Sequence, residues 1–397
     1  MPTKSYAAPM SRRLALTGLA SFGAAASWFS VAQARPRSLE DVAAEVARAL
    51  MREHDIPGLA IGLTVGGHAS VFVHGVRARD AGAPVTPRTI FEIGSVSKVY
   101  TALLGGFARV SGRLDWSDPV SRHLPELASS TIGRSTLLQL GTYAAGGLPL
   151  QFPDGIQTDE DAMGWLRTWV PEETPGEIRR YSNPSIALFG RAVAAAVGIP
   201  FREAIESEVI ARLGLERTFT EVPSGALEDY AWGVSRDGRA VRVSPGPFDT
   251  EAYGIKASVA DLLRFVEINI ASAALQDPIR RAVAETQRPR FQVADHLIQG
   301  LGWEQYALPL AKETLLAGNA PEVIFDPQPV RLIEQDAPLG PTLFNKTGST
   351  GGFGAYVAFV PSRAVGVVIL ANRNYPISAR VDAAHRLLLA ADAAVLS

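Results

Sequence analysis

Apolar positions recur at helical spacing just after residue 37. From Val42 to Leu50 they stand three and four residues apart, and Ser38 followed by Asp41 has the sequence of a helix N-terminus. The pattern predicts an amphipathic helix that ends at His54.

Pairs of short apolar runs lie near both ends of the chain. The runs 59–65 and 69–76 are separated by two adjacent glycines, and the runs 356–360 and 365–371 by a Pro-Ser-Arg-Ala turn. Each pair is typical of a β-hairpin, and a closing helix is expected over 380–391. Because hairpins rather than strand–helix–strand units join these strands, we predict an antiparallel sheet.

Between the two hairpins the pattern is mostly helical, over residues 95–110, 136–140, 159–169, 184–197 and 201–213. The stretch 221–254 is rich in glycine, proline and charge, which predicts a long surface loop. We therefore expect an α+β or mixed α/β fold in which a helical lobe is inserted into a sheet-bearing lobe. Residues 35–112 and 200–397 would form an α/β lobe with an antiparallel sheet flanked by helices, and 113–199 an inserted all-α lobe.

The first 34 residues have the pattern of an export signal. Basic residues precede an apolar stretch from Leu14 to Val31, and the small-residue site 32–34 follows. We expect cleavage after residue 34 and a periplasmic mature protein without a membrane segment. Arg12 and Arg13 also permit the twin-arginine route. The alternative is an uncleaved membrane anchor, which the glycines and serines of this stretch disfavour.

Composition excludes several functions. The 38 basic and 40 acidic residues give a net charge of −2, which provides no electrostatic footprint for nucleic acid. There is no cysteine, so disulfides and thiolate chemistry are excluded. Histidine spacings typical of zinc hydrolases, the Gly-x-Ser-x-Gly elbow and glycine-rich phosphate loops are missing from the sequence. We expect no metal and no cofactor.

Lysine is rare, with five among the 38 basic residues, and one of them lies in Ser95-Val96-Ser97-Lys98. Arginine stays protonated, whereas a buried lysine can be neutral near pH 7 and act as a base. Residues three apart share a helix face, so the Ser95 hydroxyl and the Lys98 amine can meet. The alternative is a serine helix cap followed by an exposed lysine.

Two further segments carry candidate chemistry. Tyr181-Ser182-Asn183 precedes Pro184 and a helix, so Asn183 is either a helix cap or an amide that binds substrate beside a proton-relaying phenol. The segment from Lys346 to Ser349 reads Lys-Thr-Gly-Ser and is expected on a strand before the last hairpin. A glycine-rich turn would explain its glycine but not its lysine.

In the order Ser-x-x-Lys, Tyr-x-Asn, Lys-Thr-Gly, these motifs resemble those of the penicillin-recognising serine hydrolases. The segments that surround them are similar to class C serine β-lactamases, the cephalosporinases, over 91–98, 145–151, 243–246, 252–254 and 346–380. The resemblance extends from about residue 38 to the C-terminus. It implies the two-lobed β-lactamase/transpeptidase-like fold, an all-α lobe beside an α/β lobe with the active site between them. It also implies hydrolysis of β-lactams such as cephalosporins and penicillins.

The resemblance also implies residue roles. Ser95 would be the acylated nucleophile, Lys98 and Tyr181 its proton-handling partners, and Lys346 the cation beside the phenol. The N–H groups of Ser95 and Ser349 would form the oxyanion hole. The substrate-binding positions that it implies are Gln151 and Asn183 at the side-chain amide, Tyr253 in the omega loop, and Thr347, Ser349, Asn374 and Arg380 around the substrate carboxylate.

Two positions depart from the family pattern, Asn345 where histidine is frequent and Ile377 where some members have asparagine. Alternatives with the same Ser, Lys and Tyr are a D-alanyl-D-alanine peptidase, an esterase, or a penicillin sensor that is acylated without turnover. The family implies a monomer.

Overall fold

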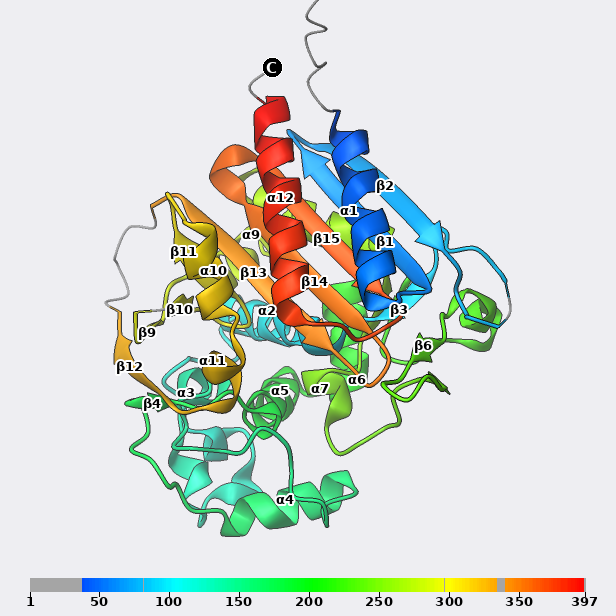
Figure 1. Cartoon of the computed structure of the whole chain (residues 1–397). Helices are drawn as coiled ribbons and strands as arrows, with labels where there is room; N and C mark the ends of the chain where they lie inside the picture. Colours follow the sequence, from blue (N-terminus) through cyan, green and yellow to red (C-terminus); the bar gives the residue numbers. More distant parts are fainter. Residues whose placement is uncertain (1–37, 81, 296, 334–339, 396–397) are drawn as a thin grey trace, which may run out of the picture. The chain divides into compact units, whose positions relative to one another are not determined.

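A ten-stranded antiparallel sheet runs through the computed structural model, which describes residues 38–80, 82–295, 297–333 and 340–395 (Figure 1). The strand order β2-β1-β15-β14-β13-β11-β10-β9-β12-β4 places the N-terminal hairpin beside the C-terminal one. The strands are β1 (Gly58–Val65), β2 (His68–Gly75), β4 (Ile178–Arg179), β9 (Phe291–Val293), β10 (Leu297–Gln299), β11 (Glu304–Ala307), β12 (Gln328–Leu332), β13 (Thr342–Ser349), β14 (Gly354–Val360) and β15 (Val365–Ala371).

Two smaller sheets lie outside it. One has the order β3-β8-β5 and the other pairs β6 with β7. Their bounds are β3 (Ile90–Glu92), β5 (Thr218–Phe219), β6 (Gly233–Val234), β7 (Ala240–Val241) and β8 (Lys256–Ser258). The first of these sheets holds the segment that leads into the Ser-x-x-Lys motif.

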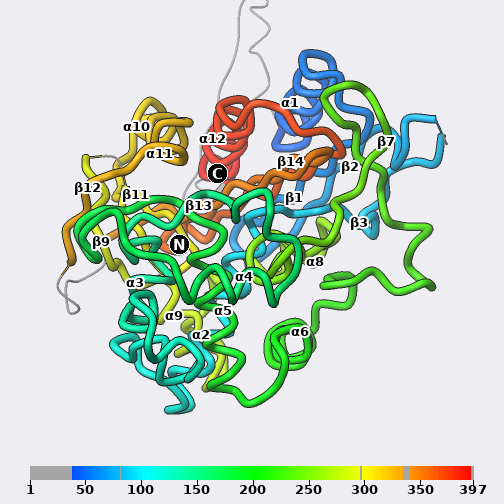
Figure 2. Tube along the Cα trace, turned by 90° about the horizontal axis from the view of Figure 1, so that it is seen from below, coloured from blue at the N-terminus to red at the C-terminus, as the bar shows by residue number. Residues whose placement is uncertain are grey.

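Helices cover both faces of the large sheet. Along β15, Val367 and Ile369 pack into a core with α1 (Leu39–His54) and α12 (Ile377–Val395), whereas Val368 and Leu370 belong to the core on the opposite face. Figures 1 and 2 show α1 and α12 side by side. The other helices are α2 (Ser97–Val110), α3 (Leu137–Gly141), α4 (Asp159–Thr168), α5 (Asn183–Val197), α6 (Phe201–Ala204), α7 (Asp249–Ala252), α8 (Val259–Ile270), α9 (Ile279–Gln287), α10 (Lys312–Gly318) and α11 (Pro321–Phe325).

Local sequence signals explain where the elements begin. Ser38 and Asp41 form the predicted capping box of α1, with the Asp41 N–H donating to Ser38 Oγ at 3.1 Å and the Ser38 N–H donating to Asp41 Oδ2 at 3.1 Å. Both predicted hairpins are present, and the antiparallel sheet is confirmed. The last helix begins at Ile377, three residues before its predicted start.

The prediction of a surface loop over 221–254 is wrong in part. This stretch contains β6, β7 and α7, and it buries Ala231, Phe248 and Glu251. Its scattered apolar residues have no regular period, yet they pack against neighbouring elements, which periodicity cannot reveal. The helical stretch 113–199 also contributes β4, which pairs with β12 at the edge of the large sheet.

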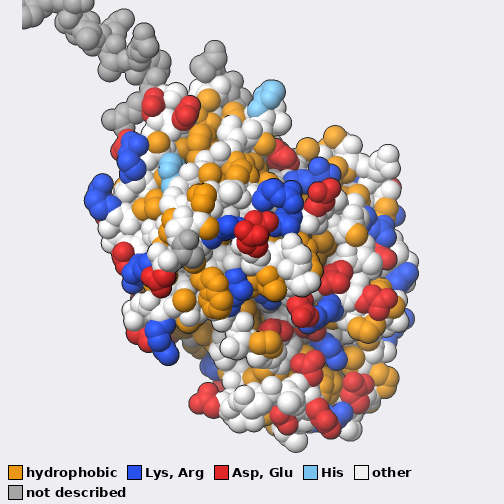
Figure 3. All heavy atoms as spheres, turned by 90° about the vertical axis from the view of Figure 1, so that its right-hand side faces the viewer, with side chains coloured by type: hydrophobic (Ala, Val, Ile, Leu, Met, Phe, Trp, Pro, Cys, Tyr) orange, Lys and Arg blue, Asp and Glu red, His pale blue; other side chains and the backbone are white. Residues whose placement is uncertain are grey.

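Lys and Arg are interspersed with Asp and Glu over the face shown in Figure 3. Among the described residues, no single helix has the length and apolar character to cross a bilayer. One pair, Asn183–Val197 with Phe201–Ala211, meets that test by length and composition only and is bent by 76°. The predicted export signal, 1–34, lies outside the described residues.

Candidate active site

The Ser95 hydroxyl and the Lys98 amine meet as predicted. A single turn of 3₁₀-helix, Gly94–Val96, leads directly into α2, and Lys98 Nζ donates to Ser95 Oγ and to the Ala252 carbonyl, both at 2.8 Å. Lys98 is fully buried, so the alternative of an exposed lysine is wrong. Burial, with repulsion from Lys346, lowers the pKa of Lys98 to about 8. A fraction of this amine is therefore neutral near pH 7 and can act as a base, which an ordinary lysine cannot.

Tyr181 lies between the two buried lysines. Lys98 Nζ is 5.1 Å and Lys346 Nζ 5.0 Å from the centroid of its ring. Burial of the phenol opposes its ionisation, but the charges of Lys346 and Lys98 outweigh burial and hold the pKa of Tyr181 below its ordinary value. The phenol therefore has a lowered pKa between two amines, and its Oη has no hydrogen-bond partner among the described residues.

Lys346 differs from Lys98 in its partner. It lies on β13, and its Nζ is 3.3 Å from Glu304 Oε1 on β11, the neighbouring strand. Burial disfavours the charged amine, yet the Glu304 carboxylate raises the pKa of Lys346 above its ordinary value. Lys346 is thus a permanent cation beside Tyr181.

Sequence reasoning missed Glu304 and Arg179. Arg179 Nη2 lies 3.7 Å from Glu304 Oε1, and Arg179 Nε donates to Gln299 Oε1 at 2.9 Å. The Arg179 guanidinium also lies 5.5 Å from the Tyr181 ring centroid. The sequence contains one signal for Glu304, which is an isolated acidic residue directly after the apolar Trp303.

Close packing of β13 against the turn before Ser95 brings the two expected oxyanion donors together. A β-carbon at Gly348 would lie 1.9 Å from the Ile93 carbonyl oxygen, and one at Gly94 would lie 2.5 Å from Ser349 N. Gly94 also has a φ of +51°, which favours glycine. Both glycines are therefore needed for the backbone of Ser349 to reach the turn that holds Ser95.

Arg380, expected around the substrate carboxylate, is buried and hydrogen-bonded to other groups of the protein. Its side chain is fully buried, and Nη1 donates to the Gly348 carbonyl at 2.6 Å and to Ser349 Oγ at 3.0 Å. Nη2 donates to Asn374 Oδ1 at 2.5 Å. Ser349 and Asn374, in contrast, are exposed. A motif match aligns positions along the chain but does not reveal burial.

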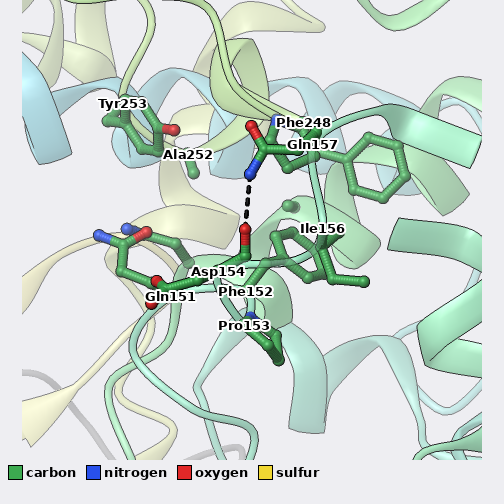
Figure 4. Close-up of a pocket in the computed structure, with 12 residues that line it drawn as sticks. Gln151, Phe152, Pro153, Asp154, Ile156, Gln157, Phe248, Ala252 and Tyr253 are labelled. Carbon is green, nitrogen blue, oxygen red and sulfur yellow. Dashed lines mark hydrogen bonds between the residues drawn. The ribbon is translucent and has the colours of Figure 1, made fainter. Parts of the chain in front are cut away.

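The three residues expected around the substrate side chain meet in one pocket of about 220 Å³. Figure 4 shows Tyr253 and Ala252 on one side and Gln151 on the opposite side. Asn183 also lines the pocket. Its alternative role as helix cap is wrong, because Ser182 caps α5 by accepting from Ser185 N at 3.0 Å.

The amide oxygen of Asn183 is free for a ligand. Asn183 Oδ1 is buried and has no hydrogen-bond partner among the described residues, and such a group is costly unless a ligand or water satisfies it. The pocket adjoins the reacting groups through Ala252, whose carbonyl accepts from Lys98.

The remaining expected residues lie on the elements around the site. Thr347 is buried on β13, and Ile377 is the first residue of α12. Asn345 is buried, and its Nδ2 donates to Asn319 Oδ1 and to Tyr356 Oη, both at 3.0 Å, which is a structural role. In the described ranges, no group of three or more His, Asp or Glu side chains is placed to hold a metal ion.

A serine whose hydroxyl contacts a buried amine of lowered pKa, beside a phenol and a backbone donor, defines a serine hydrolase that works through an acyl-enzyme. Residues 43–392 match the family described as Beta-lactamase. The chain is 48% identical to a β-lactamase of Pseudomonas fluorescens over 86% of this chain and 96% of that protein, and 38% identical to one of Escherichia coli K12 over 89% and 94%.

Two solved structures are similar to this chain and indicate the same family. A class C β-lactamase from Rhodobacter sphaeroides superposes with a TM-score of 0.84 at 40% identity, covering 90% of this chain and all of that one. A protein of Pseudomonas syringae described as β-lactamase/D-alanine carboxypeptidase gives a TM-score of 0.85 at 40% identity, over 88% and 98%. The chain belongs to the β-lactamase family, as a serine enzyme of class C.

Proposed function

We propose that this enzyme hydrolyses the β-lactam amide of cephalosporins and penicillins through an acyl-enzyme on Ser95, and so confers resistance to these antibiotics. The observation that carries the proposal is the 2.8 Å hydrogen bond from the buried Lys98 amine to Ser95 Oγ, together with the pKa of Lys98 of about 8. A positioned base of this kind contributes about 10²- to 10⁴-fold to the rate.

In the acylation step, Ser95 Oγ attacks the lactam carbonyl carbon while its proton passes to Lys98 or Tyr181. The N–H groups of Ser95 and Ser349 hold the oxyanion. The carbon–nitrogen bond of the ring then breaks, and the leaving nitrogen takes a proton from the Tyr181–Lys98 pair. Lys346 stabilises the phenolate form of Tyr181, because Glu304 keeps it charged.

In the deacylation step, a water molecule attacks the Ser95 ester and gives up a proton, and the ring-opened acid leaves with Ser95 Oγ reprotonated. Tyr181 and Lys98 are the two candidate bases for this water. Both are buried beside Ser95, so the step needs no further side chain.

Substrate recognition divides between two sides of Ser95. Gln151, Asn183 and Tyr253 bind the acyl side chain and its amide in the pocket described above. Thr347, Ser349 and Asn374 bind the carboxylate of the substrate, with the last two oriented by Arg380.

We further propose that the enzyme is exported to the periplasm, with residues 1–34 removed, and acts there as a monomer. The basic residues followed by an apolar stretch and a small-residue site support export. β-Lactams reach their cell-wall targets through this compartment, so the location suits the activity.

The decisive assay measures hydrolysis of the chromogenic cephalosporin nitrocefin by purified residues 35–397. The intact mass of the protein is then measured after it is mixed with nitrocefin. We expect sustained turnover by the wild type and none by Ser95→Ala. A stoichiometric gain in mass without turnover would instead indicate a peptidase or sensor. No reaction at all would direct the search to ester substrates.

A further inference from the structure

Phe248 forms a wall of the pocket that receives the acyl side chain, and it is held in an unfavourable backbone conformation. It is buried and lines the pocket together with Phe152, whose ring meets it edge-on at 5.9 Å between centroids (Figure 4). Its φ is +52°, in the left-handed region. A non-glycine residue is strained in this region, so contacts from the surroundings have to hold it.

Asp159 and Arg191 supply those contacts from two helices. The Phe248 N–H donates to Asp159 Oδ1 at 3.0 Å, at the start of α4. The Arg191 guanidinium on α5 lies 4.9 Å from the centroid of the Phe248 ring. One contact fixes the backbone of Phe248 and the other covers its side chain.

Arg191 also joins the helices on either side of the pocket. Its Nη1 lies 3.6 Å from Asp159 Oδ2 and 3.7 Å from Glu251 Oε1 on α7. The Glu251 side chain is only 5% exposed, and α7 approaches α5 so closely that a β-carbon at Gly190 would lie 2.9 Å from Glu251 Cγ. A half-exposed arginine thus bridges α4 and α7 across Phe248.

We propose that Asp159, Arg191 and Glu251 form a clamp that holds Phe248 in place and thereby limits the size of the acyl side chain that the enzyme accepts. The inference rests on the function proposed above. A compact side chain fits beside the fixed Phe248 ring, whereas a bulky branched one has to displace it. Asp159, Arg191 and Glu251 are positioning residues, because they act through Phe248.

Loosening the clamp leaves the reacting groups in place. The C-terminal half of α7 is bound separately to α2, where Thr101 Oγ1 donates to the Glu251 carbonyl at 2.7 Å and Lys98 Nζ to the Ala252 carbonyl at 2.8 Å. These bonds end on backbone atoms, so a change at Arg191 or Asp159 removes neither. The clamp therefore affects substrate choice more than chemistry.

The test compares kcat/KM for two cephalosporins, cefalotin with a compact side chain and ceftazidime with a bulky branched one. Assays are run at pH 8, because burial raises the pKa of Glu251 to about 7 and the carboxylate is ionised above that value. In Arg191→Ala and in Asp159→Ala we expect the ceftazidime-to-cefalotin ratio to rise about tenfold, a typical effect of a changed pocket contact.

Phe248→Ala should raise the same ratio without disturbing the clamp. Adding Arg191→Ala to Phe248→Ala should then change the ratio by less than twofold, because both act on one wall. A merely structural role of Arg191 would lower thermal stability and leave the ratio unmoved. Arg280→Ala is the matched control, since this half-exposed arginine pairs with Asp277 at 3.1 Å and does not line the pocket.

Two outcomes would overturn the clamp. One is a ceftazidime-to-cefalotin ratio within twofold of the wild type in folded Arg191→Ala, which includes equal losses for both substrates. The other is independent effects of Arg191→Ala and Phe248→Ala on that ratio. If Arg191→Ala does not fold, the ceftazidime-to-cefalotin ratio of kcat/KM is measured in Phe248→Ala and in Asp159→Asn instead. A ratio within twofold of the wild type in those variants would overturn the clamp. Wild type that fails to hydrolyse cefalotin would overturn the proposed function itself, which separates the two failures.

Discussion

The two buried lysines of the site have surroundings that favour opposite charge states. Lys98 hydrogen-bonds a hydroxyl and a carbonyl, both neutral, whereas Lys346 lies against the Glu304 carboxylate. Burial lowers the pKa of Lys98, whereas at Lys346 the attraction of Glu304 and Tyr181 outweighs burial and raises the pKa. One amine is suited to accept a proton and the other to stay charged, which is the division of labour that acyl transfer needs.

The lowered pKa of Lys98 predicts that this residue destabilises the fold below pH 8. Its pKa is about 8 in the folded chain and 10.5 for an ordinary lysine, so the unfolded chain holds the proton more tightly. The free energy of unfolding of the wild type then rises with pH between these values. We expect inactive Lys98→Met to be more stable than the wild type by about 1–3 kcal/mol at pH 7, and this advantage to shrink toward pH 10.

Urea unfolding at pH 7, 8.5 and 10 measures this difference. Lys312→Met is the control, because the Lys312 side chain is 41% exposed and its hydrogen bond and ion pair with Asp382 at 2.9 Å raise its pKa. That variant should be no more stable than the wild type at pH 7. An advantage of Lys98→Met that stays constant with pH, or no advantage at pH 7, would contradict the prediction.

At the scale of elements, the sequence predicts what is local and misses what depends on strand pairing. Ser95 and Lys98 are three residues apart, so helix geometry alone predicts their contact. Glu304 reaches Lys346 only because β11 pairs with β13, with Glu304 opposite Asn345. That register joins segments 41 residues apart, and no periodicity in the sequence reports it. The burial of Arg380 depends instead on how α12 packs against the sheet, because its guanidinium donates to the Gly348 carbonyl of β13.

Packing of β13 against the turn before Ser95 predicts a strong effect of one methyl group. In Gly348→Ala the new β-carbon would lie 1.9 Å from the Ile93 carbonyl oxygen, so β13 has to move away from the nucleophile's turn. We expect kcat for nitrocefin to fall about 100-fold or more, as when an oxyanion donor is lost. We also expect a loss of roughly 1–3 kcal/mol of stability from overpacking.

Gly351→Ala provides a matched comparison, since nothing lies within 4 Å of a β-carbon at that position. Its kcat and its unfolding midpoint should stay close to those of the wild type. Equal activity of Gly348→Ala and Gly351→Ala would show that the approach of β13 to Gly94 does not hold the oxyanion donors.

Across the whole molecule, the large sheet separates two apolar cores that differ in their relation to the active site. The core around α2, α5 and α8 surrounds the reacting groups, and Tyr181 belongs to it. The core under α1 and α12 lies on the opposite face and includes Leu50, Ile369 and Leu387. Stability and catalysis are therefore coupled on one side of the sheet and separable on the other.

Leu387 and Leu389 of α12 test that separation. Leu387 is fully buried in the far core, whereas Leu389 on the same helix is 58% exposed. Leu387→Ala should cost about 2–5 kcal/mol of stability through the lost burial and the cavity left behind, and thermal unfolding should shift down by several degrees. Its kcat/KM at 25 °C, per folded molecule, should match the wild type, because α2, β13 and α5 keep their contacts. Leu389→Ala should change neither the stability nor kcat/KM appreciably.

A fall in kcat/KM with Leu387→Ala, at a temperature where the variant is fully folded, would contradict this separation. It would mean that the far core also positions the catalytic groups, through the strands that the two faces share.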